Sequence, residues 1–132
     1  MNYIVHKRFK GKSVSGEVNI PAMTECKGVE GLIFHEGKII CIETSENAHQ
    51  HFAVNDDGNG LERGRLTQGI VKTLNKQDKD YQARWDKVWG NLRCRKYKRT
   101  ERDDYWLWNH DFFTADIEEL RYIAALVGAK AI

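Results

Sequence analysis

Residues 31–43 read GLIFHEGKIICIE, and they contain the clearest β-hairpin signal in this chain of 132 residues. Two apolar runs, 31–34 and 39–43, flank a turn at 35–38. Gly37 can supply the positive φ that such a turn needs. The pattern therefore predicts two antiparallel strands joined by this turn.

More strands are predicted upstream of the hairpin. Residues 3–9 are rich in β-forming residues, 17–20 alternate polar and apolar, and 23–27 form a weaker candidate that Gly28 ends. Pro21 stops the second of these runs, because proline cannot donate a hydrogen bond to a central ladder. Short strands at this spacing are typical of a meander or small barrel, and NIPA at 19–22 favours an SH3-like barrel.

Helical periodicity replaces β alternation after residue 44. The sequence predicts a short helix from residue 45 to 52, then helices at 61–74 and 78–89, and a final helix from residue 114 to 127. Two glycines inside the second helix, Gly64 and Gly69, each weaken it by about 1 kcal/mol relative to alanine.

End signals support these helices. Ser45, Asp78 and Thr114 are the predicted N-caps, while Gly90 and Gly128 are predicted to close the last two helices. The fold class is therefore α+β, a small antiparallel β half followed by three to four helices. We expect a single domain over residues 1–132, β-rich to about 44 and helical from about 45, because neither half is large enough to fold stably by itself.

Composition limits the class of protein. Hydrophobic residues make up 41% and charged residues 30%, as in ordinary globular domains, and a net charge of +2 does not require a polyanionic partner. No apolar run is long enough to cross a membrane. Three widely spaced cysteines without a leading signal segment predict reduced thiols and a cytoplasmic location.

The stretch 85–113 holds all four tryptophans and, within 93–102, six of the 21 basic residues. Trp85 and Trp89 lie one helical turn apart, so both are predicted to be largely buried. Of Trp106 and Trp108, we expect at least one to be partly exposed beside the cations.

Arginines interleaved with aromatic residues suit a surface that contacts phosphates and stacks on bases, and the same residue types dominate protein interfaces. The candidate partners are therefore a nucleic acid, through the 93–102 segment, or a host or phage protein. The predicted binding residues are Arg93, Arg95, Lys96, Tyr97, Lys98, Arg99, Trp106 and Trp108.

Metal-binding patterns are incomplete. Asn55, Asp57 and Asn59 match the first positions of a calcium loop, but Leu66 stands where the bidentate glutamate belongs, which favours a helix-capping loop. His49 and His51 could form half of a zinc site with Cys26 and Cys41 only if their segment were extended, and it is predicted to be helical. No metal or cofactor is predicted.

Catalytic candidates are equally incomplete. Cys94 has an arginine on each side, which would lower its pKa and make it the most reactive thiol, but no local base accompanies it. The trio Asn109-His110-Asp111 reads as a polar turn. A magnesium site remains an alternative, with its ligands drawn from Asp103, Asp104, Asp111, Glu118 and Glu119. No catalytic residue is predicted.

Three segments resemble small uncharacterised proteins encoded by phages and prophages of Gram-positive bacteria. They are YIVHKRFKGK at 3–12, VNIP at 18–21 and TSENA at 44–48, and the similarity is firmest over residues 3–52. The resemblance implies a phage accessory protein and carries over no site residue. It favours a binding module over an enzyme. The alternatives are a metal-dependent nuclease or hydrolase using Asp103, Asp104 and His110, and a virion or assembly component.

Overall fold

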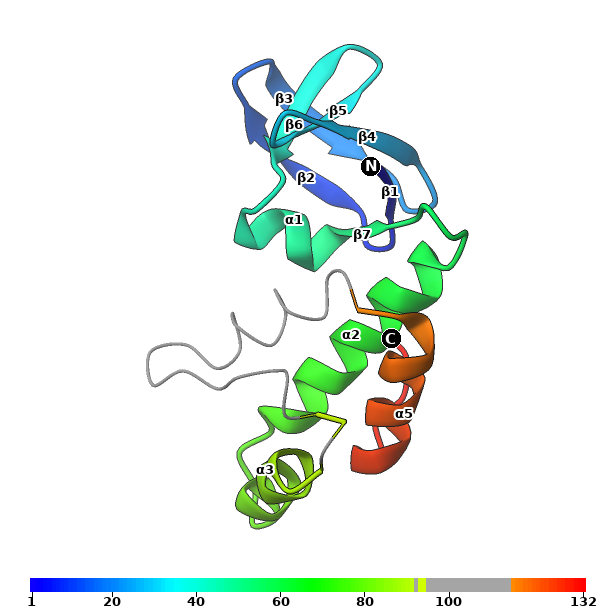
Figure 1. Cartoon of the computed structure of the whole chain (residues 1–132). Helices are drawn as coiled ribbons and strands as arrows, with labels where there is room; N and C mark the ends of the chain where they lie inside the picture. The colour runs from blue at the N-terminus through cyan, green and yellow to red at the C-terminus, as the bar shows by residue number, and fades with distance from the viewer. Residues whose placement is uncertain (92, 95–114) are drawn as a thin grey trace. The chain divides into compact units, whose positions relative to one another are not determined.

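The computed structural model of the chain describes residues 1–91, 93–94 and 115–132 (Figure 1). They form two compact units, Met1–Gly64 and Arg65–Ile132, called here the β unit and the helical unit. Strands dominate the first and helices the second, which confirms the predicted α+β class. Within the described residues, no helix is long and apolar enough to cross a lipid bilayer.

The β unit contains a five-stranded antiparallel sheet and a separate two-stranded ribbon. The sheet has the strand order β6 (Lys38–Ile42), β5 (Leu32–His35), β4 (Glu25–Val29), β1 (Asn2–Val5) and β7 (Phe52–Val54). The ribbon pairs β2 (Phe9–Ser13) with β3 (Gly16–Ile20). The pairing does not close the sheet on itself, so the SH3-like barrel is not confirmed.

The predicted hairpin is confirmed as β5 and β6. Its two central turn residues, Glu36 and Gly37, have φ values of 50° and 76°, the positive pair typical of a tight hairpin turn. The ladder shifts register between Ile33 and Phe34. Such an irregularity bends the strand beside it.

The remaining strands differ from the prediction in their limits. The run 3–9 divides into β1 and β2, with residues 6–8 outside both strands. The third candidate begins at Glu25, because Met23 has a φ of 71°, and it continues through Gly28. A Cβ at Gly28 would overlap the Tyr3 ring, which explains why only glycine fits at this position of the strand. Strand β7 was not predicted, and because of it the β-rich part of the chain extends to Val54 instead of ending near residue 44.

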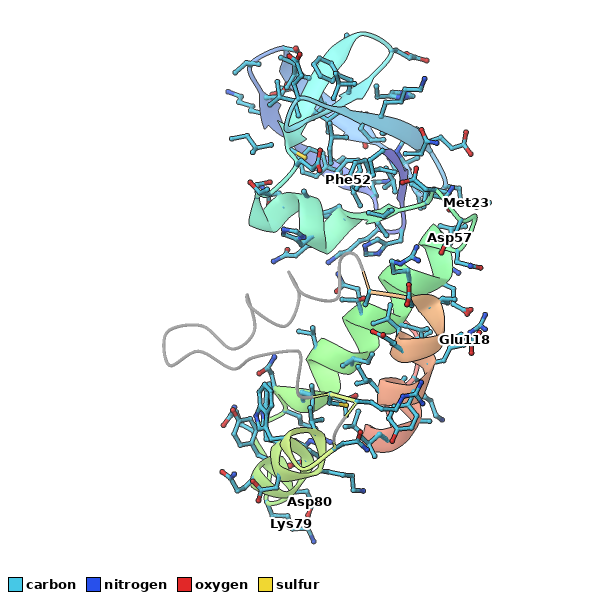
Figure 2. All side chains as sticks on the ribbon, in the orientation of Figure 1. Met23, Phe52, Asp57, Lys79, Asp80 and Glu118 are labelled. Atoms are coloured by element: carbon cyan, nitrogen blue, oxygen red, sulfur yellow. The ribbon has the colours of Figure 1, made fainter. Side chains whose placement is uncertain are left out.

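Helix α1 (Glu46–His51) begins as predicted. The Ser45 hydroxyl accepts a hydrogen bond from the Ala48 amide at 3.2 Å. Phe52, labelled in Figure 2, is fully buried where the helix ends. The core of the β unit gathers the buried apolar faces of the sheet, the ribbon and α1, and includes Tyr3, Val5, Phe9, Val18, Ile20, Ile33, Ile40, Ala48 and Phe52.

Helix α2 (Gly60–Leu74) matches the predicted helix at 61–74. Its glycines have a packing role. A Cβ at Gly64 would overlap the His6 ring, and a Cβ at Gly69 would overlap the Lys130 carbonyl. The segment after the last helix also donates the Ile132 amide to the Arg65 carbonyl at 3.0 Å. The glycines therefore lower helix propensity but allow these close approaches.

The helical unit is built around Trp85. Helices α2, α3 (Tyr81–Trp89) and α5 (Ile117–Val127) contribute buried apolar side chains to one cluster. Trp85 is 0% exposed, which confirms its predicted burial, and its ring stacks on Trp89 with centroids 6.0 Å apart. Trp89 is only partly buried, so the prediction that both indoles are largely buried holds for Trp85 alone.

Two predicted helix starts need correction, and one predicted end differs in its conformation. The N-cap of α3 is Asp80, because Asp78 instead accepts hydrogen bonds from the Asp80 amide and from Arg84. Figure 2 labels Asp80 at the start of this helix. Gly90 ends α3 as predicted, but with a right-handed φ of −75° instead of the left-handed conformation of a C′ glycine. The N-cap of α5 is Asp116, and the predicted cap, Thr114, lies outside the described residues. Gly128, with φ 69°, closes α5 as predicted.

Candidate functional site

Most of the predicted site lies outside the described residues. Arg93 is its one member among the described residues, and the others lie outside them: Arg95, Lys96, Tyr97, Lys98, Arg99, Trp106 and Trp108. The alternative nuclease residues Asp103, Asp104, His110 and Asp111 also lie outside the described residues. Both sets therefore stay predictions.

Arg93 is exposed and lies over an aromatic ring of α5. Its guanidinium carbon is 4.3 Å from the centroid of Tyr122, a cation–π contact. Asn91 fixes this ring by donating its side-chain amide to the Tyr122 hydroxyl at 2.6 Å, and it accepts the Arg93 backbone amide at 3.0 Å. A neutral ring thus orients this guanidinium, and Glu119 lines the same small pocket as Arg93 and Tyr122.

A cleft lies elsewhere in the helical unit, away from Arg93. It has a volume of about 890 Å³ and is lined by the second half of α2, the α2–α3 loop and the segment after α5. Lys72, Lys76 and Lys130 face it together with Thr73. Three cations from separate segments therefore share one concave surface.

Two carboxylates, Asp78 and Asp80, line this cleft together with Arg84 and the three lysines, so four cations meet two anions there. Asp78 binds Arg84 at 2.8 Å and lies 3.8 Å from the Lys76 ammonium. The guanidinium and the Asp80 amide hold the pKa of Asp78 below its ordinary value. Lys72 and Lys130 make no ion pair within the part of the chain that the structure describes. The cleft can therefore accept an anionic group at these two ammonium ions.

Charge is also divided unequally between the two units. Residues 65–132 hold 14 Lys and Arg against ten Asp and Glu, whereas residues 1–64 hold seven against nine. The net charge of the whole chain is therefore small because the positive charge of the helical unit is partly balanced by the negative charge of the β unit. A polyanion in solution would be attracted to that unit.

The acidic loop before α2 serves the fold. Arg63, only 4% exposed, binds both carboxylate oxygens of Asp57 and donates to the Val54 carbonyl. Asn55 accepts the Gly60 amide at 2.8 Å. These bonds occupy oxygens that a calcium ion would need, in line with the capping-loop interpretation. The guanidinium, together with the Asn59 amide, holds the pKa of Asp57 well below its usual range.

The histidines of the predicted half zinc site lie on one short helix. His49 and His51 both lie on α1, as predicted, and the His51 imidazole is 3.0 Å from the Lys7 carbonyl oxygen. Among the described residues, no three His, Cys, Asp or Glu side chains gather closely enough to hold a metal ion.

The cysteines are shielded. Cys94 is 0% exposed in the core of the helical unit, which contradicts its prediction as the most reactive thiol. Burial raises the pKa of both Cys26 and Cys41 to about 11. Cys41, predicted to be a small buried residue, is only partly buried.

Sequence reasoning missed the lysine cleft. Lys72 lies on α2, whereas Lys76 follows the end of that helix, so no helical spacing links the two lysines. Lys130 joins them only because the chain after α5 packs back against Gly69, and no local pattern reveals that return. Comparison with known proteins adds nothing to this, because no protein-family model, curated protein or solved structure matches the chain.

Proposed function

We propose that this chain is a non-enzymatic binding module for nucleic acid and that its helical unit contacts the phosphates. The observation that carries the proposal is the cleft shared by Lys72, Lys76 and Lys130. Cations that neutralise phosphates release condensed counterions, and this release supplies most of the affinity in sequence-independent binding. The positive balance of residues 65–132 supports the same partner.

The basic segment 93–102 extends this proposal. Its six cations, with Tyr97 among them, combine charge with a surface on which bases can stack. Arg93 supports this use, because Tyr122 orients its guanidinium without neutralising it. A role for the segment as a whole stays a prediction.

The cellular context is also a proposal. The resemblance to phage and prophage proteins suggests an accessory protein in the host cytoplasm. The nuclease and the virion component remain alternatives, and cleavage of DNA or RNA that depends on Mg²⁺ and is lost in Asp104→Ala would favour the nuclease.

Fluorescence anisotropy with labelled single-stranded and duplex oligonucleotides tests the function. We compare Lys72→Gln/Lys130→Gln with Lys79→Gln/Lys87→Gln, which removes two exposed lysines of the helical unit outside the cleft. Removing two phosphate contacts should lower the slope of log affinity against log salt by roughly 1.4 to 1.8, and affinity on the order of tenfold per contact at 0.1 M salt. The control should stay close to wild type.

Two results would overturn the proposal. Equal losses in both double variants would show a general charge effect without a site in the cleft. A wild-type chain that binds neither oligonucleotide at low salt would exclude the function itself. Changing Arg95, Lys96 and Arg99 together to Glu tests the basic segment separately.

A second candidate function, binding of a protein partner, has an observation of its own. Val29, Leu32 and Ile42 are direct cross-strand neighbours on β4, β5 and β6. Val29 is 50% exposed and Ile42 is 58% exposed. An exposed apolar row of this kind suits a protein contact. Ile42→Lys should then abolish capture of a partner from host lysate, whereas Met23→Lys, at an exposed apolar position away from the row, should not.

A further inference from the structure

The β unit carries a compact positive surface of its own. Lys7, Arg8, Lys10 and Lys12 lie within six residues and are all exposed. They account for four of the seven basic residues in a unit that has nine acidic ones. Positive charge is thus concentrated at one place in an otherwise acidic unit.

The ribbon fixes the direction of these cations. Phe9, Val18 and Ile20 are buried, so the inner face of the β2–β3 ribbon belongs to the core. Because side chains alternate along a strand, Lys10 and Lys12 must point outward, and Arg8 continues the same alternation. A one-residue slip in register would bury the lysines and expose the apolar residues, so the arrangement is strongly specified.

Cross-strand neighbours leave most of this charge uncompensated. Lys10 is opposite Asn19, a neutral residue, and Arg8 donates to the Asn19 side-chain oxygen at 2.7 Å. That bond orients the guanidinium across the ribbon without neutralising it. Lys12 is opposite Glu17, the one acidic residue of the two strands. Three cations therefore share this face with a single carboxylate.

A shallow hollow follows the same face. It has a volume of about 700 Å³ and is lined by Lys10, Lys12, Glu17, Asn19 and the backbone between them. Lys10 and Lys12 are two residues apart, about 6.8 Å along an antiparallel strand. Long lysine side chains at that spacing can reach separate phosphates of a nucleic acid backbone, and a two-stranded ribbon can enter a major groove.

We propose that the outer face of the β2–β3 ribbon is a second phosphate-contacting surface, with Arg8, Lys10 and Lys12 as its contacts. The ligand is the phosphodiester backbone of the nucleic acid that the helical unit binds, so this inference rests on the proposed function. The ribbon adds contacts from the β unit, where the net charge of the unit would not predict them. Asn19 is a positioning residue, because it acts by orienting Arg8.

The test uses the full chain and a labelled duplex of about 20 base pairs, with the matching single strand as a second probe, over about 50 to 200 mM salt. Lys10→Gln/Lys12→Gln is compared with Lys27→Gln/Lys38→Gln, which removes two exposed lysines from other strands of the same unit. The ribbon variant should lower the salt slope by roughly 1.4 to 1.8, and the control should leave it unchanged. The probe with the larger loss identifies the form of nucleic acid at the ribbon.

Each other outcome has a defined meaning. If wild type binds and the ribbon variant keeps its slope, the inference is wrong while the proposed function stands. In that case the lysines serve another purpose, such as protecting exposed strand edges from pairing with other chains. Equal losses in both double variants would overturn the inference too. If wild type binds neither probe, the proposed function fails as well. Circular dichroism melts of both variants check that the fold is intact.

Discussion

The β unit and the helical unit are stabilised in different ways. The helical unit depends on one large indole, Trp85, enclosed by three helices and stacked against Trp89. The β unit distributes its core over smaller apolar residues. It is also held by the ion pair between the buried Arg63 and Asp57, called here the polar clamp. A single truncation should therefore damage the helical unit more, whereas neutralising Asp57 in acid should weaken the β unit.

The sequence provides a separate probe for each unit. All four tryptophans lie in residues 65–132, so tryptophan fluorescence reports on the helical unit. Amide hydrogen exchange at β1, the strand between β4 and β7, reports on the β unit. If the units unfold together, every variant will shift both signals. If they unfold separately, each variant will shift one.

The largest effect is expected from Trp85→Ala. Truncating a fully buried aromatic residue leaves a cavity and costs about 3–5 kcal/mol in the free energy of unfolding. Urea melts followed by the remaining tryptophans measure the loss, with the exposed Lys87→Ala on the same helix as control. A variant that melts like wild type would contradict the described burial of Trp85.

Gly69→Ala should come next, although alanine is the better helix former. The new methyl group would overlap the Lys130 carbonyl, and relieving such a clash costs about 1–3 kcal/mol. Faster exchange of the Ile132 amide, which donates to Arg65, would show that the segment after α5 has moved away from α2. Stabilisation of about 1 kcal/mol, the gain in helix propensity, would mean that this contact is absent.

Asp57→Ala tests the polar clamp of the β unit. It leaves the buried Arg63 guanidinium without its carboxylate, at a cost of roughly 1–3 kcal/mol. Glu17→Ala, an exposed position without an ion pair among the described residues, is the control. Hydrogen exchange at β1 should accelerate, while the tryptophan signal stays unchanged if the units are independent.

The same clamp predicts a pH dependence. Because the pKa of Asp57 is lower in the folded chain, its stabilisation is complete above the unfolded value of about 3.9 and is lost as pH falls toward the folded value. The stability difference between wild type and Asp57→Ala should therefore shrink below about pH 4. A difference that stays constant through that range would rule out the ion pair as its source.

The smallest effect is expected from Ser45→Ala. It removes the side-chain acceptor for the Ala48 amide at the start of α1, which costs about 1 kcal/mol. Hydrogen exchange of the Ala48 amide measures the change, and Ser45→Asp, which keeps an acceptor, should restore protection. Equal protection in the alanine variant would show that the cap contributes nothing.

Local signals gave accurate predictions where one short segment decides its own structure. The Glu36-Gly37 turn and the Ser45 cap are of this kind, because the residues that form each bond are neighbours in sequence. Strand β7 was missed because Phe52 to Val54 become a strand only by pairing with β1, about 50 residues away. Likewise, Asp78 has the chemistry of an N-cap, but its bond with Arg84 leaves that position to Asp80.

The candidate site shows the same division. The cation-rich segment 93–102 is visible in the sequence, although only Arg93 and Cys94 of it are described. The alternate spacing of Arg8, Lys10 and Lys12 is also visible in the sequence. It indicates a shared outward face only because Phe9 and Ile20 are buried on the opposite face of the ribbon. The lysine cleft needed the return of residues 128–132 to α2, which no short pattern encodes.

The shielded cysteines make the native chain well suited to site-directed labelling. Burial raises the pKa of Cys41, which keeps this thiol protonated and slow to react at neutral pH, and Cys26 is buried. Cys94 has no exposed surface. Maleimide dyes should therefore react much faster with an exposed cysteine introduced at the ribbon tip, for example Val14→Cys, than with the partly buried Cys41 or the two buried thiols. A fluorophore attached there would sense a ligand bound at the ribbon directly.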